Sequence, residues 1–170
     1  IISADSRMVY RGMTIGSGKD LDDYIVDGEQ VPYHLIDICE PGYRFNVYEF
    51  QCAFQNAYMD ITARHRMPIM CGGTGLYIES VLKSYELGQV RFPERKSLTI
   101  GLKIDRDLRR EKITRRLKAR LEEGMIEEVQ TLLKTVSAER LIRYGLEYKY
   151  VTLYCIGQLS YDEMFRQLEI

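Results

Sequence analysis

The fold class of this chain is decided by residues 68–77, PIMCGGTGLY. Residues 68–71 form a short apolar run, a glycine turn follows at residues 72–75, and residues 76–82 have helical spacing. A strand, a glycine turn and a helix in succession are the unit of a parallel α/β sheet. Ligands of such sheets bind at the carboxyl ends of the strands, so the glycine turn is a candidate site.

The start of the chain predicts a second strand with a polar carboxyl end. Residues 1–4 are an apolar run, and Asp5, Ser6 and Arg7 follow it directly. A carboxylate at that position can act as a base or bind a metal ion. On local pattern alone, a helix cap by Asp5 or Ser6 is an equal alternative.

Most of the remaining chain is predicted to be helical. The expected helices cover residues 47–65 with Asn46 as cap, 107–121 closed by Gly124, 125–133, and much of 138–170 with a Ser160–Glu163 capping box. Residues 97–105 alternate as in a strand, with Leu98, Ile100, Leu102 and Ile104 on one side. We therefore predict one α/β domain over residues 1–170, with a parallel sheet flanked by helices and a helical C-terminal part.

Composition places the chain among ordinary globular proteins. Its 170 residues are 45% hydrophobic and 29% charged, with a net charge of −1, which excludes a disordered chain and a polycation. Binding of nucleic acid therefore requires a local basic patch. No apolar run approaches the ~20 residues that span a membrane. The four cysteines form no C-x-x-C pair, so we expect buried, reduced thiols without a disulfide partner in a cytoplasmic protein.

Two glycine-rich segments are candidates for binding phosphate. Residues 16–19, GSGK, resemble part of a P-loop, but Met13 stands where the motif requires glycine and Asp20 where it requires Ser or Thr. The turn at residues 72–75 is better placed, since backbone N–H groups before a helix form an anion site. A tight turn without a ligand explains that turn equally well.

One predicted helix carries a cationic face. Arg109, Lys112, Arg116 and Arg120 recur at three- and four-residue spacing and share that face. A solvated surface is the ordinary explanation of such a run. The alternative is an arginine directed at phosphate, whose oxygens the guanidinium fork matches.

The chain has two histidines, which excludes a multi-histidine metal centre, and we expect His34 to form a structural hydrogen-bonding pair with Asp37.

Taken together, these segments resemble the tRNA dimethylallyltransferase (isopentenyl-tRNA transferase) family. The matching stretches are residues 1–13 (IISADSRMVYRGM), 32–37 (PYHLID), 71–77 (CGGTGLY), 144–148 (YGLEY) and 160–164 (SYDEM), together with Arg116, Gly124 and Glu128. They cover most of the chain in the family's order. The resemblance implies a fold like that of P-loop kinases. It also implies transfer of a dimethylallyl group from dimethylallyl diphosphate to N6 of the adenine 3′-adjacent to the anticodon of tRNA.

The resemblance also assigns expected roles to individual residues. Asp5 matches the catalytic base, and Asp5, Ser6, Arg7 and Met8 match the stretch that holds the target adenine. Arg116 matches the arginine that contacts the diphosphate, and Gly72, Gly73 and Thr74 line the same pocket. The implied partners are the tRNA anticodon arm and dimethylallyl diphosphate, with Mg²⁺ as cofactor.

The sequence departs from the family pattern in three ways. The family's P-loop segment precedes the stretch that here begins at Ile1, and the family's helical RNA-binding insertion has no counterpart near residues 88–92. Met8 stands where many members carry Gln. We therefore expect a longer parent protein whose P-loop is required for activity. The alternatives are an adenine-nucleotide isopentenyltransferase, a P-loop-type nucleotide kinase, and a non-catalytic, degenerate binding module.

Overall fold

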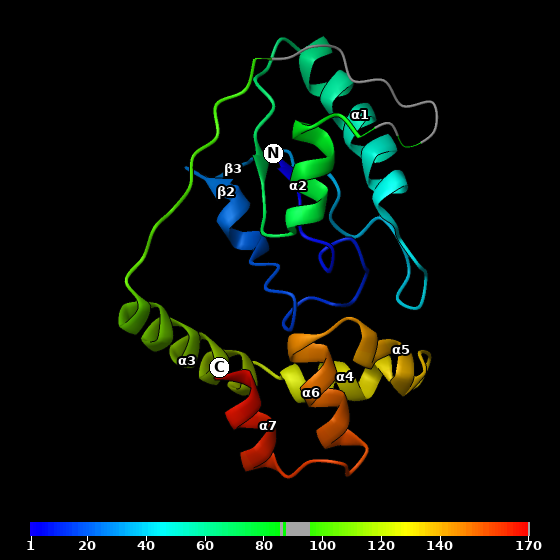
Figure 1. Cartoon of the computed structure of the whole chain (residues 1–170), viewed down its shortest axis with the longest axis vertical. Coiled ribbons are helices and arrows are strands. Elements are labelled where there is room, and N and C mark those ends of the chain that lie inside the picture. The colour runs from blue at the N-terminus through cyan, green and yellow to red at the C-terminus, as the bar shows by residue number, and fades with distance from the viewer. Residues whose placement is uncertain (86, 88–95, 170) are drawn as a thin grey trace. The chain divides into compact units, whose positions relative to one another are not determined.

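The computed structural model describes residues 1–85, 87 and 96–169 of the chain (Figure 1). The expected position of the absent insertion, residues 88–92, lies outside the described residues. The chain divides into two compact units. We call residues 1–11 and 20–97 the sheet unit, and residues 12–19 and 98–170 the helical unit.

The sheet unit is built around β1 (Ile2–Ser3) and β4 (Met70–Cys71), which pair in parallel with Ile2 opposite Met70. The N–H of Ile2 donates to the carbonyl of Ile69 at 2.8 Å, and the N–H of Ser3 donates to the carbonyl of His34 at 3.0 Å on the other side. β1 therefore has hydrogen-bonded neighbours on both sides. The unit also contains a 3₁₀ turn (Leu21–Tyr24) and a hairpin of β2 (Ile25–Val26) and β3 (Glu29–Gln30).

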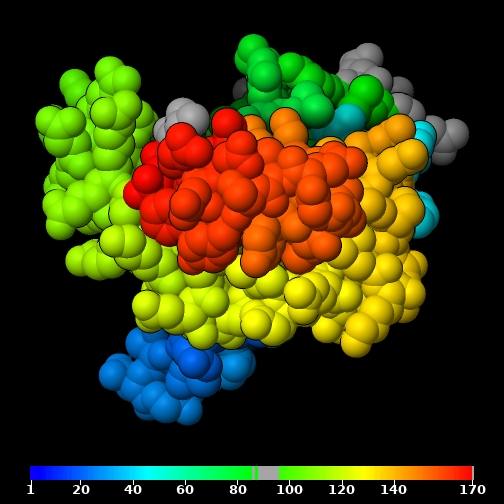
Figure 2. Space-filling model, turned by 90° about the horizontal axis from the view of Figure 1, so that it is seen from below, coloured from blue at the N-terminus to red at the C-terminus, as the bar shows by residue number. Residues whose placement is uncertain are grey.

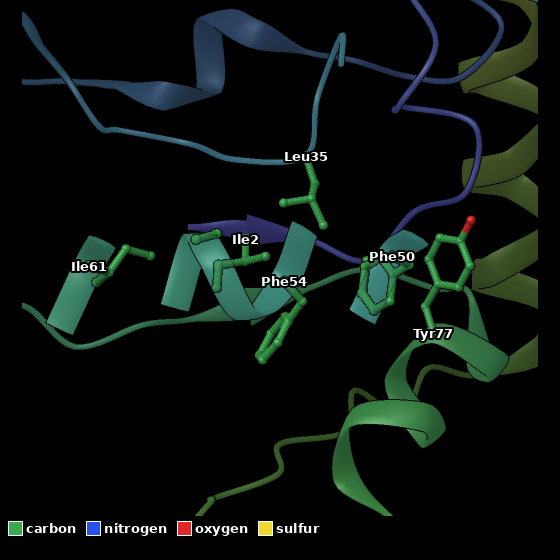
Figure 3. Close-up of a cluster of buried hydrophobic side chains, with 8 residues drawn as sticks. Ile2, Leu35, Phe50, Phe54, Ile61 and Tyr77 are labelled. Atoms are coloured by element: carbon green, nitrogen blue, oxygen red, sulfur yellow. The ribbon is translucent and has the colours of Figure 1, made fainter. Parts of the chain in front are cut away.

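Helix α1 (Val47–Ala63) closes the core of the sheet unit. Its N-cap residue Asn46 forms the reciprocal capping box with Glu49. Apolar residues spaced by three and four positions turn one stripe of the helix inward. The buried cluster consists of Ile2, Ala4, Leu35, Phe50, Phe54, Ala57, Ile61 and Tyr77, the last from α2 (Gly75–Leu82) (Figure 3). The rings of Phe50 and Tyr77 stack at a centroid distance of 4.0 Å.

The helical unit contains α3 (Arg106–Glu122), α4 (Met125–Leu132), α5 (Ala138–Arg143), α6 (Leu146–Cys155) and α7 (Tyr161–Leu168). Gly124 separates α3 from α4 with φ +104°, a conformation that favours glycine. Ser160 and Glu163 form the predicted capping box of α7. Figure 2 shows α6 and α7, in orange and red, side by side. The helices bury Leu117, Met125, Val129, Leu141, Tyr148, Val151 and Met164.

The predicted strand at residues 97–105 is wrong. These residues form neither helix nor strand, and Leu98, Ile100 and Leu102 are 87%, 79% and 98% exposed. An alternating apolar pattern supplies the faces of a strand, but a strand also requires a neighbour to receive its backbone hydrogen bonds. No described strand pairs with this segment.

Candidate active site

The candidate site begins where β1 ends. Asp5 follows the strand after Ala4, and its carboxylate accepts a hydrogen bond from the N–H of Arg7 at 2.8 Å. The Arg7 Nε lies 3.9 Å from the same oxygen, and the two side chains are 19% and 21% exposed. No helix follows directly, so Asp5 closes a turn and does not cap a helix. The turn holds a mostly buried carboxylate, still in contact with solvent, at the carboxyl end of a strand.

Thr74 joins this turn to the glycine turn. Its N–H donates to the carbonyl of Ala4 at 3.0 Å, and its hydroxyl oxygen accepts from the N–H of Ser6 at 2.9 Å. The hydroxyl of Thr74 also donates to the hydroxyl of Ser6 at 3.2 Å. Because β1 and β4 are parallel neighbours, their carboxyl ends meet at one edge of the sheet. The structure thus brings together two turns that lie far apart in the sequence.

The glycines of the second turn differ in their surroundings. A Cβ atom on Gly72 would lie 2.5 Å from the carbonyl carbon of Ala4, which is closer than atoms can approach. A Cβ on Gly73 or Gly75 would meet nothing within 4 Å. Gly72 is therefore required for close packing of β4 against β1. Gly73 and Gly75 leave open space at the start of α2, where Thr74 makes no side-chain cap.

Two further side chains belong to this region. The Ser3 hydroxyl donates to the Met8 thioether at 3.6 Å, which fixes the half-buried Met8 beside the strand end. Burial, with smaller contributions from Cys39, Glu49 and Asp5, raises the pKa of Tyr77 to about 12. Sequence reasoning gave Tyr77 no role. The sequence signal for Tyr77 is its position three residues after Thr74, because residues at this spacing lie on the same face of a helix.

Arg116 lies in the helical unit, on the exposed part of α3. Arg109 and Lys112 are exposed as well, whereas Arg120 is 9% exposed and pairs with Glu147 at 3.5 Å. A Cβ on Gly18 would lie 1.9 Å from Nη2 of Arg120, so this arginine packs against the glycine backbone. Arg120 is therefore a structural residue, whereas the remaining three cations form no ion pair with any residue that the structure describes.

Residues 12–19 also belong to the helical unit, and their backbone is bound by a carboxylate. Glu128 accepts hydrogen bonds from the N–H groups of Thr14, Ile15 and Gly16 at 2.8, 2.7 and 3.1 Å, and from the Tyr148 hydroxyl at 2.8 Å. A phosphate loop needs such N–H groups for its ligand. The P-loop-like GSGK segment is thus a packed structural loop, as its departures from the motif indicated.

Two smaller expectations are corrected. His34 lies 3.7 Å from Asp60 of α1, so its acidic neighbour is Asp60 and not Asp37. The pairing follows from the fold, because His34 forms a parallel bridge with Ile2 of β1 and lies near α1.

The four cysteines are free, but Cys71 is exposed and the other three are only half-buried. Cys71 reaches the surface because it ends β4 at the open turn.

The described residues include no group of three or more acidic, histidine or cysteine side chains that could hold a metal ion. Asp5, Ser6 and Thr74 do supply oxygen atoms of the kind that Mg²⁺ binds. Mg²⁺ is commonly held by one or two such ligands together with phosphate oxygens of the substrate. The residues therefore fit a metal ion that arrives with a diphosphate.

Among the described helices, none has the length and apolar character required to cross a membrane.

Comparison with known proteins identifies the family. A family model described as IPP transferase matches residues 8–97 and 84–170. tRNA dimethylallyltransferase 1 of Parabacteroides distasonis is 47% identical over 229 residues, covering 100% of this chain and 75% of the relative. The chain belongs to the tRNA dimethylallyltransferase family. tRNA dimethylallyltransferase 2 of Porphyromonas gingivalis is 44% identical, with 99% and 76% covered. The resemblance inferred from the motifs is confirmed.

Solved structures agree with this membership. The tRNA isopentenylpyrophosphate transferase of Bacillus halodurans matches with a TM-score of 0.79 at 27% identity, over 99% of this chain and 72% of that one. A tRNA isopentenylpyrophosphate transferase of Staphylococcus epidermidis, 23% identical, has the same fold with a TM-score of 0.81 over 99% of this chain and 76% of that one. The predicted fold class of the family, a parallel α/β sheet flanked by helices with a helical C-terminal part, is confirmed.

Proposed function

We propose that this protein transfers a dimethylallyl group from dimethylallyl diphosphate to N6 of the adenine that follows the anticodon of tRNA. The observation that carries the proposal is the carboxylate of Asp5, held at the carboxyl end of β1 beside the Thr74 turn. The names of the relatives, which are tRNA dimethylallyltransferases, support it.

The chemistry of the acceptor explains why a fixed carboxylate is useful. The lone pair of an adenine amino group is delocalised into the ring, so N6 is a weak nucleophile. In the proposed step N6 attacks the allylic carbon, the carbon–oxygen bond breaks, and its electron pair leaves on the diphosphate. Asp5 orients the amine and accepts its proton. The turn that binds the Asp5 carboxylate to the Arg7 N–H preorganises this base.

The leaving group requires positive charge and N–H donors. Arg116 can bind diphosphate oxygens through two parallel hydrogen bonds. Gly72, Gly73 and Thr74 precede α2, whose first N–H groups have no side-chain cap. Each well-placed donor of this kind contributes on the order of 3 kcal/mol to stabilising the developing charge. Mg²⁺, carried on the diphosphate beside Ser6 and Thr74, would neutralise further charge when bound.

The acceptor base must leave its stack to reach Asp5. Enzymes that modify a base inside structured nucleic acid turn the nucleotide out into a pocket. Ser6, Arg7 and Met8 follow Asp5 on the same turn, so they are the proposed contacts to the adenine. Met8 offers an apolar, polarisable surface to the base in place of the amide that many family members carry.

We also propose that relatives carry their RNA-binding insertion near the place where the sheet unit ends and the long segment of the helical unit begins, at residues 97 and 98 of this chain. The alignment with the Parabacteroides protein spans 229 residues, whereas the present chain has 170, so the relative has additional residues inside the matched span. The two matches to the family model overlap in residues 84–97, which supports an insertion at this place.

An assay of the intact protein with Asp5→Asn tests the function. A general base contributes about 10²- to 10⁴-fold, so we expect kcat to fall by this factor while tRNA binding is retained. The matched control is Asp27→Asn, an exposed carboxylate in the β2–β3 turn. Wild-type turnover by Asp5→Asn would exclude Asp5 as the base.

Radiolabelled dimethylallyl diphosphate offered with tRNA and AMP side by side distinguishes the alternatives. Label on tRNA alone supports the proposal, and label on AMP would indicate a nucleotide isopentenyltransferase. Labelling of neither by the intact wild-type protein would favour a kinase or a non-catalytic module.

The proposed role of Arg116 is tested separately. Arg116→Gln should weaken diphosphate binding, and the same substitution at its exposed neighbour, Arg115→Gln, is the control.

A further inference from the structure

The charges of α3 are segregated on its surface. Arg109, Lys112 and Arg116, which we call the basic stripe, recur at intervals of three and four residues and share one face. The acidic residues of the helix, Asp107, Glu111 and Glu122, recur on the roughly opposite face. Alternating signs along one face are typical of an exposed helix with many ion pairs. The basic stripe contains cations alone.

The cations of the basic stripe are exposed and have no acidic partner among the described residues. Ion pairs at a spacing of four residues do occur in other helices of this chain, as between Arg64 and Asp60 at 2.6 Å and between Lys83 and Glu79. Asp105 stands four residues before Arg109, but its carboxylate caps α3 by accepting from the N–H groups of residues 107 and 108. Like charges at these spacings repel each other, so an anion bound along the stripe would relieve this repulsion.

The length of the basic stripe indicates the kind of anion. Arg116 lies seven positions after Arg109, which corresponds to about 10 Å along the helix axis. A single diphosphate reaches one end of such a line, whereas a polynucleotide presents regularly spaced phosphates along all of it. The net charge of the chain is −1, so attraction of RNA must come from a local surface of this kind.

We propose that Arg109 and Lys112 bind phosphates of the RNA strand that carries the target adenine. This inference rests on the proposed function, which assigns Arg116, one turn further along the helix, to the diphosphate. Arg109 and Lys112 share one face of α3 with Arg116, so under this proposal the same helix face binds both the diphosphate and phosphates of the acceptor strand. Phosphate contacts of this type fix the register of the nucleic acid and carry no sequence information.

The salt dependence of RNA binding tests the proposal. We compare the wild-type protein with Arg109→Gln/Lys112→Gln, using a tRNA transcript at about 50 to 200 mM KCl. Each phosphate contact contributes about 0.7–0.9 to the slope of log K against log salt, so the double variant should lose about 1.5. When the salt concentration rises fourfold, the binding constant of wild type should therefore fall by a factor about eight times larger than that of the double variant.

The control is a second double variant, which removes two positive charges from the face of α3 that also carries the acidic residues. Arg115 and Lys118 are exposed and lie beside Glu111 and Glu122, so Arg115→Gln/Lys118→Gln should leave the slope unchanged. Glutamine is a good helix former, and circular dichroism checks that both variants keep their helices. An equal loss of slope in both variants, or no loss in the stripe variant, would overturn the proposal. A selective loss of slope without prenyl transfer by wild type would reject the proposed function alone.

Discussion

Gly72 and Gly73 are adjacent, yet only one of them is confined. A Cβ on Gly72 would lie within 2.5 Å of Ala4, whereas Gly73 has open space. We expect Gly72→Ala to lower the free energy of unfolding of the sheet unit by about 1–3 kcal/mol, because overpacking there forces β4 from β1. Gly73→Ala should change it by less than about 0.5 kcal/mol. Urea titration measures both values, and equal effects would contradict the assigned packing role.

His34 makes the stability depend on pH. Burial is the main cause that lowers the pKa of His34 from its usual value of 6.5, while the nearby Asp60 carboxylate opposes the shift. The unfolded chain therefore binds the proton more readily, and stability falls as the pH drops through 6.5 toward the folded pKa. Urea unfolding at a series of pH values should show a smaller loss for His34→Gln than for wild type. The exposed His65→Asn should behave as wild type, and a loss in His34→Gln as large as in wild type would refute this assignment.

Local residue patterns predicted the turns of the candidate site but not their connections. The position of Asp5 after a strand, and of the glycine turn after another, followed from apolar runs and glycines that are adjacent in sequence. The bond between Ser6 and Thr74 joins residues 68 positions apart, and His34 finds Asp60 across the core. Such pairings depend on the packing of whole elements, which residue spacing does not encode.

Among the elements, the loop of residues 12–19 depends on one side chain of α4. Glu128 receives three backbone N–H donors and one hydroxyl, and Gly16 approaches the Tyr148 ring so closely that a Cβ would lie 2.8 Å from it. Glu128→Gln replaces one acceptor oxygen by a donor, which leaves N–H groups unsatisfied. We expect a loss of about 2 kcal/mol in unfolding free energy, measured by urea titration.

The neighbouring Glu127→Gln is the control for this loop, because Glu127 is exposed. It should change stability by less than about 0.5 kcal/mol. If Glu128→Gln were equally mild, water would be replacing the carboxylate, and the loop would not depend on Glu128.

Elements with local signals were predicted well, and elements that need a distant partner were not. The caps at Asn46 and Ser160 and the apolar stripe of α1 are written within a few residues of sequence, and the structure has all three. Residues 97–105 carry the alternation of a strand but lack a described neighbour, so their apolar side chains remain exposed. Periodicity indicates which faces an element would have, whereas pairing decides whether a strand forms.

At the scale of the whole molecule, the chain has two compact units with separate buried side chains. Phe54 belongs to the core of the sheet unit, and Leu141, which is 0% exposed, belongs to the helical unit. The sequence predicted one domain over residues 1–170, and no pattern along it marks residues 12–19 as part of the second unit. That assignment arises from contacts of the loop with Glu128 and Arg120, more than 100 residues later.

Native-state hydrogen exchange can determine whether the two units open independently. Leu141→Ala leaves a cavity and should cost about 2–5 kcal/mol. If the units open separately, amides of α4 and α6 lose protection while those of α1 keep it, because sub-global opening follows the locally buried contacts. Phe54→Ala should produce the reverse pattern. Equal loss of protection in both units, from either substitution, would show that the chain opens as one cooperative domain, as its sequence alone predicts.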